Sequence, residues 1–208
     1  MTMTTEVQLR YTKVTRMIHW GFALLIPLQL LSEELMKRPK PGRIRTESQE
    51  FFFEMHEWVG MLALTLILMR FAWGLMNKEA SVSRLYPYFT TTGRSHLVYE
   101  LKHEVMGWFK GKLPQPSRER CIASAVHGLG LLLVLAMGVT GAMMLYGMEE
   151  SGKMLGMIHD AKEVHEMLGE LLWIYIIAHV AMTVLHMLLG HSMLKRIFCV
   201  RDNKVSSD

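Results

Sequence analysis

Four apolar stretches, each about as long as a bilayer is thick, constrain this sequence more than any other feature. They run from about residue 17 to 35, 58 to 76, 122 to 146 and 167 to 189, and most charged residues lie outside them. A helix needs about 20 apolar residues to cross a hydrocarbon core of about 30 Å. Only helices satisfy the backbone of such stretches within lipid. The sequence therefore predicts one all-α domain over residues 1–208, an integral membrane four-helix bundle with up-down topology.

The distribution of Lys and Arg predicts how the bundle is oriented. Of the 23 Lys and Arg residues, 16 lie in segments 1–16, 70–120 and 195–208, and 7 lie in the other two loops. Loops that are rich in Lys and Arg remain in the cytoplasm. We therefore expect both termini in the cytoplasm. Because the basic residues flank apolar spans, we expect contact with membrane lipid and no nucleic-acid partner.

The loop between the second and third spans contains a further predicted helix. In residues 95–110, Leu97, Leu101 and Val105 recur every four residues, with charged residues among them. This pattern is typical of an amphipathic helix at the membrane surface. A helix packed over the cytoplasmic end of the bundle would show the same pattern, so the sequence leaves both placements open.

Cysteine usage excludes several kinds of redox centre. The chain has two cysteines, Cys121 and Cys199, and neither belongs to a CxxC or CxxCH motif. An iron–sulfur ligand set, a disulfide framework and a covalently attached c-type haem are therefore excluded. The 19 methionines lie mostly in the apolar stretches and are best interpreted as packing residues.

Two histidines in the fourth span are spaced so that they share one helix face. His165 and His179 are fourteen residues apart, which is close to four full turns of helix and about 21 Å along its axis. Ionisable residues within membrane spans are costly and usually mark a functional site. One face of this helix therefore presents an imidazole near each end.

The predicted topology supplies each of these histidines with a partner. His19 opens the first span on the cytoplasmic side, beside His179, and His56 opens the second span on the outer side, beside His165. Each pair can hold one iron from both faces of a porphyrin, so we predict two b-type haems. Two axial imidazoles leave iron with no open position, which favours electron transfer over oxygen chemistry. Zinc sites are the alternative, but no cysteine or carboxylate cluster completes four ligands.

Four other residues are weaker candidates for the same sites. Arg16 and Arg70 lie near the cytoplasmic ends of their spans, where they either pair with a haem propionate or act as positive-inside anchors. His127 opens the third span and either contacts a propionate or a quinone, or reaches to the interface. His186 lies seven residues beyond His179 and is an alternative ligand.

From about residue 11 to 197, the sequence resembles the bacterial cytochrome b561 family and the related b-type cytochrome subunits of nickel–iron hydrogenases. The resemblance is carried by the segments YTKVTRMIHW, HEWVG, VHGLGLLLVLAMGVTGAMMLY and HEMLGELLWIYIIAH. It implies His19, His56, His165 and His179 as haem ligands. The segment SRERCIASAVHG stands where hydrogenase subunits carry a GHNP-like turn, which favours another redox partner.

The resemblance implies a dihaem cytochrome of the bacterial inner membrane that transfers electrons between the quinone pool and a redox protein. Two alternatives remain open. The first is a superoxide:quinone oxidoreductase, because the basic loop of residues 37–45 can steer an anion. The second is a non-catalytic haem-bearing anchor that recruits a soluble redox subunit, such as a hydrogenase.

Overall fold

The computed structural model describes residues 12–36, 42, 44–77, 85–110, 121–149 and 152–188. The helices are α1 (Lys13–Leu35), α2 (Glu47–Met76), α3 (Thr91–Phe109), α4 (Cys121–Gly147) and α5 (Met157–Leu188), and the short 3₁₀ helix η3 (Pro87–Phe89) precedes α3. No strand occurs among the described residues. The predicted all-α fold is therefore confirmed.

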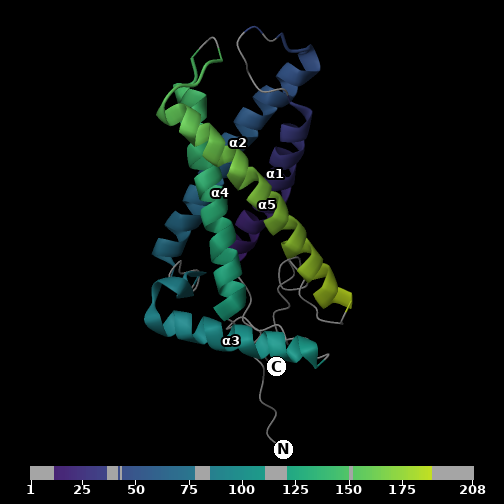
Figure 1. Ribbon diagram of the computed structural model, residues 1–208, viewed down its shortest axis with the longest axis vertical. Helices are drawn as coiled ribbons and strands as arrows, with labels where there is room; N and C mark the ends of the chain where they lie inside the picture. Colours follow the sequence, from purple (N-terminus) through teal and green to yellow (C-terminus); the bar gives the residue numbers. More distant parts are fainter. Residues whose placement is uncertain are drawn as a thin grey trace, which may run out of the picture.

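The four long helices form a bundle in which successive helices run in opposite directions (Figure 1). α1 packs along α2, α4 packs along α5, and α2 joins the two pairs by packing against α4. Each of the four is long and apolar enough to cross a membrane. The predicted transmembrane four-helix bundle is thus confirmed. Residue 189, the C-terminal tail and the basic residues Lys37, Arg38, Lys40 and Arg43 lie outside the described part of the chain.

Helices α2 and α5 begin about ten residues before the apolar stretches that we predicted. Thr46 starts α2 with a capping box, in which its side chain accepts from the backbone of Gln49 and its own backbone donates to the Gln49 side chain. His56 and His165 therefore do not open their helices, as the hydropathy suggested, but lie about two turns inside them. Hydropathy marks the apolar part of a helix, whereas capping determines where the helix starts.

The core lies midway along the bundle. Ile26 and Leu30 from α1, Ala63 from α2 and Leu172 from α5 form one buried cluster, and none of them is more than 6% exposed. Partly buried side chains of α4 complete it, namely Leu133, Val134 and Met137. This buried apolar cluster lies between the two ends of the bundle.

In each long helix, a histidine and an apolar core residue are seven positions apart. Residues seven apart differ by only about 20° around a helix, so they share a face. On each helix, a buried or partly buried apolar residue of the core lies seven residues from a histidine: His19 and Ile26, His56 and Ala63, His127 and Val134, His165 and Leu172. One further step of seven reaches Arg70, Gly141 and His179. The bundle therefore has polar groups at two levels and an apolar level between them.

Helix α3 lies across one end of the bundle (Figure 1). Its Glu100 carboxylate accepts hydrogen bonds from the backbone N–H groups of Cys121 and Ile122, each at 3.1 Å. A carboxylate in this place accepts hydrogen bonds from N–H groups that have no partner within α4, and its negative charge interacts favourably with the positive end of the helix dipole. Tyr99 and Phe109 are 72% and 89% exposed. The predicted helix is present and is joined to α4; its contact with lipid stays a prediction.

Candidate functional site

His56 and His165 face each other at one end of the bundle, which we call the His56 end. Their rings come from α2 and α5, with centroids 6.4 Å apart and planes at 77°. The sequence predicted that these two histidines lie at the same level, and the structure brings them together.

Each of these rings has a hydroxyl group beside its Nδ1 atom. Ser32 Oγ lies 3.0 Å from His56 Nδ1, and Thr140 Oγ1 lies 2.8 Å from His165 Nδ1. The side chain of Gln29 also donates a hydrogen bond of 2.9 Å to the backbone carbonyl of His56. All four long helices therefore contribute to the His56 end.

The opposite end of the bundle, the His19 end, brings three histidines together. His179 lies within electrostatic range of both His127 and His19. The His127 and His179 rings are 5.5 Å apart and nearly perpendicular, and Tyr175 stacks on His179 at 5.7 Å. The sequence predicted that His19 and His179 share this level, but the nearest imidazole ring contact of His179 among the described residues is with His127.

The Nδ1 atoms at the His19 end are held differently from those at the His56 end. His127 Nδ1 donates to the carbonyl of Ala123 in its own helix at 2.6 Å. His19 Nδ1 is buried and has no hydrogen-bond partner among the described residues. Among the described residues, His19 Nδ1 therefore has no counterpart of the hydroxyl contacts found at the His56 end.

Arg70 shares a face of α2 with His56 and Ala63, and it is buried, with 8% exposure. Arg70 is close enough to Tyr86, the residue before η3, for its charge to lower the pKa of that phenol. Burial and the neighbouring Tyr88 outweigh this effect and raise the pKa of Tyr86 to about 12. Burial also raises the pKa of Tyr88. Both phenols therefore keep their protons at neutral pH, and in the described residues neither hydroxyl has a hydrogen-bond partner. An Arg that served only as an interfacial anchor would be exposed, so burial favours a role inside the bundle.

The other candidate residues occupy less informative places. Arg16 is half-buried in the first turn of α1, and His186 lies in the last turn of α5. Both make interactions within the described part of the chain. His159 is exposed at the start of α5, within 4 Å of Asp160 and Glu163.

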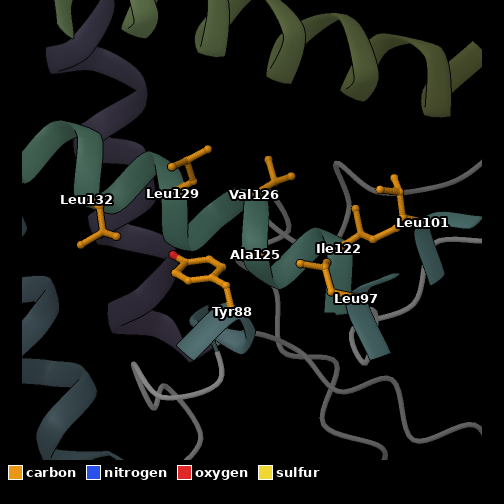
Figure 2. Close-up of a pocket in the computed structure, with 8 residues that line it drawn as sticks. All are labelled: Tyr88, Leu97, Leu101, Ile122, Ala125, Val126, Leu129 and Leu132. Carbon is orange, nitrogen blue, oxygen red and sulfur yellow. The ribbon is translucent and has the colours of Figure 1, made fainter. Parts of the chain in front are cut away.

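A cavity of about 370 Å³ lies between α3, α4 and Tyr88 (Figure 2). Its walls are apolar and include Leu97 and Leu101 of α3 and Ile122, Val126 and Leu129 of α4. Figure 2 shows the Tyr88 ring directed towards α4 beside these residues. The cavity suits an apolar chain or ring and lies in the half of α4 that carries His127.

Comparison with models of protein families shows which family this chain belongs to. The model of the prokaryotic cytochrome b561 family matches residues 10–199. The chain belongs to this family. No curated protein and no solved structure gives a significant match. Membership makes the protein a multi-pass bacterial membrane cytochrome that binds b-type haem and acts in electron transfer, as the sequence predicted.

The His56 end fits a b-type haem of this cytochrome b561. A metal–imidazole bond is about 2 Å long, so two imidazoles on opposite sides of one ion have ring centres about 6 Å apart. The rings of His56 and His165 have this separation. No group of three or more His, Cys, Asp or Glu side chains that could hold a metal ion occurs within the described residues.

Ser32, Thr140 and Gln29 were not identified from the sequence. Hydroxyl residues are common in membrane helices, where they usually bond to their own backbone, so nothing in the sequence distinguished them. A partial signal was available, because Thr140 immediately precedes Gly141, which lies fourteen residues after His127. That spacing places Thr140 at the level of His165.

Proposed function

We propose that this cytochrome b561 holds two b-type haems, one between His56 and His165 and one between His19 and His179, and transfers electrons across the membrane. The observation that carries the proposal is the facing pair of His56 and His165, whose rings are 6.4 Å apart. A haem with two imidazole ligands takes up and releases one electron and has no open coordination position.

The second haem is supported by the geometry of α5. Leu172 lies seven residues from both His165 and His179 and is 2% exposed, so the face that carries both histidines is turned into the bundle. The two levels are separated by about 21 Å of helix. The buried apolar cluster that contains Leu172 lies between the two levels.

Quinone is the substrate that best fits the His19 end. The buried hydroxyls of Tyr86 and Tyr88 are hydrogen-bond donors, and a quinone carries two carbonyl acceptors. The apolar cavity beside Tyr88 suits a hydrophobic tail. The ring of His127 contacts His179, and the adjacent Gly128 lies against Leu85 and Tyr86. We therefore assign proton exchange with quinol to His127.

The basic segments support a cytoplasmic location for both termini in the inner membrane, which places the His19 end at the cytoplasmic face. The redox protein that exchanges electrons with the His56 end then lies on the outer side. For the superoxide alternative, Arg45 would help to attract the anion. However, Arg45 pairs with Glu50 at 2.6 Å and lies over the ring of Phe53, so its charge is already compensated.

An anchor for a soluble subunit is the second candidate, and α3 is the observation that favours it. Tyr99, Met106 and Phe109 are exposed on a helix that is fixed to α4 through Glu100. An anchor would work without electron transfer through its haems, whereas a conduit requires both.

The test is to measure haem per chain and electron transfer in the same preparation. We expect two low-spin b-type haems in the purified protein, from the reduced-minus-oxidised spectrum. In proteoliposomes with quinol supplied to the bilayer and a membrane-impermeant oxidant trapped in the lumen, His19→Ala and His56→Ala should each abolish transfer, whereas His159→Ala should not. One haem per chain, or unchanged transfer in both variants, would refute the proposal; unchanged transfer with intact partner recruitment would favour the anchor.

A further inference from the structure

The two histidines of the His56 end are held by hydroxyl groups from the two helices that supply no histidine there. Ser32 of α1 meets His56 of α2, and Thr140 of α4 meets His165 of α5, at 3.0 and 2.8 Å. Ser32 is 1% exposed and is thus fully enclosed. Both contacts are made at Nδ1, so the two histidines have the same hydrogen-bonding arrangement.

The direction of each hydrogen bond follows from the other partner of the hydroxyl. Ser32 Oγ donates to the carbonyl of Gln29 at 2.7 Å, and Thr140 Oγ1 donates to the carbonyl of Ala136 at 2.8 Å. A hydroxyl has one proton, and a carbonyl can only accept. Each hydroxyl oxygen must therefore accept from the histidine, so both rings carry their proton on Nδ1 and a lone pair on Nε2.

Ordinary backbone bonding by hydroxyl residues does not account for this arrangement. Thr65 and Thr183 also donate to the carbonyl four residues earlier, as is usual in membrane helices. Neither of them bonds to a histidine ring among the described residues. Ser32 and Thr140 are distinguished by the second bond, which both make at the same level of the bundle.

We propose that Ser32 and Thr140 are positioning residues that set the tautomer and basicity of His56 and His165 as haem ligands. This inference rests on the proposed function. A ligand imidazole that donates its second N–H is fixed in orientation and becomes more basic. Greater basicity stabilises ferric over ferrous iron, so these hydroxyls lower the midpoint potential at the His56 end. Tight packing assists them, because a Cβ atom on Gly141 would lie 3.2 Å from Cε1 of His165.

The test compares substitutions that remove the hydroxyl with one that keeps it, each with only a small change in side-chain size. Thr140→Val removes the hydroxyl, Thr140→Ser keeps it, and Ser32→Ala removes the hydroxyl on the other side. Thr65→Val is the matched control, because it removes the same backbone bond without a histidine. Each variant is purified with its haem, and both midpoint potentials are measured by redox titration, with the low-spin EPR signals as the second measurement.

We expect Thr140→Val and Ser32→Ala to raise one of the two midpoint potentials and to shift the EPR signal of the same haem. Thr140→Ser and Thr65→Val should match the wild type. Loss of one haem in Thr140→Val with retention in Thr140→Ser would also support the hydroxyl. Two haems with unchanged potentials in both hydroxyl-free variants would overturn the inference, as would equal haem loss in Thr140→Val and Thr140→Ser. Fewer than two haems in the wild type would instead refute the proposed function.

Discussion

At one end of the bundle, the rings of His56 and His165 lie 6.4 Å apart, and each has a hydroxyl group beside its Nδ1 atom. At the opposite end, His179 packs against His127 and Tyr175. The Nδ1 atom of His19 has no hydrogen-bond partner in the described residues. The same seven-residue pattern leads to both ends. The difference lies in what surrounds the rings: small hydroxyl residues and Gly141 at one end, and a third histidine with tyrosines at the other.

The two ligand pairs therefore differ in how far they are preorganised for haem binding. At the His56 end, side-chain hydrogen bonds hold both imidazoles in one orientation, so a cofactor binds without rearrangement of its ligands. At the His19 end, the ring of His179 packs against His127 and Tyr175. We therefore expect the ligands of the His19 end to rearrange when haem binds.

The largest expected effect comes from removing a histidine of the ordered pair. His165→Ala should lower the haem content from two to one per chain, because it removes the imidazole that faces His56. The measurement is a pyridine haemochrome assay with quantified protein. His159→Ala is the control on the same helix and should retain both haems. Retention of both haems in His165→Ala would show that the His56 end is not a haem site.

A smaller effect is expected from the third histidine of the other end. His127→Ala should keep two haems, since we assign the ligand role to His19 and His179, but it should slow quinol oxidation several-fold. Haem content and steady-state quinol oxidation are measured together. If His127→Ala loses one haem while His19→Ala keeps both, His127 rather than His19 is the ligand.

The smallest effect tests how tightly the His56 end is packed. Gly141→Ala places a Cβ atom 3.2 Å from His165 Cε1, so the ring must shift by a few tenths of an ångström. We expect both haems to remain, with a small shift in the low-temperature α-band of one. Gly169→Ala is matched, because its Cβ atom would meet only Met137 at 4.0 Å. Identical spectra for the two variants would argue against close packing around His165.

The sequence predicted the four long helices from hydropathy, which marks spans long enough to cross a membrane, and the helix of the connecting loop from its periodicity. It placed His56 and His165 at the wrong point in their helices, since a capping box at Thr46 extends α2 beyond its apolar part. Helix ends depend on local hydrogen bonds that hydropathy does not measure.

The candidate site was predictable only in part. The fourteen-residue spacing of His165 and His179 identified the shared face of α5, because helix geometry alone determines it. The partners of each ring required the packing of different helices. The contacts of Ser32 with His56 and of Thr140 with His165 join residues 24 and 25 positions apart, and no local pattern records them.

The seven-residue spacing limits how such a chain can change its length. Deleting one residue between Leu172 and His179 would turn His179 by about 100° relative to Leu172 and remove it from the shared face. Inserting seven residues into each long helix would preserve that face while adding about 10 Å of helix. Insertions of this kind keep the shared face but lengthen the route between the two ends of the bundle.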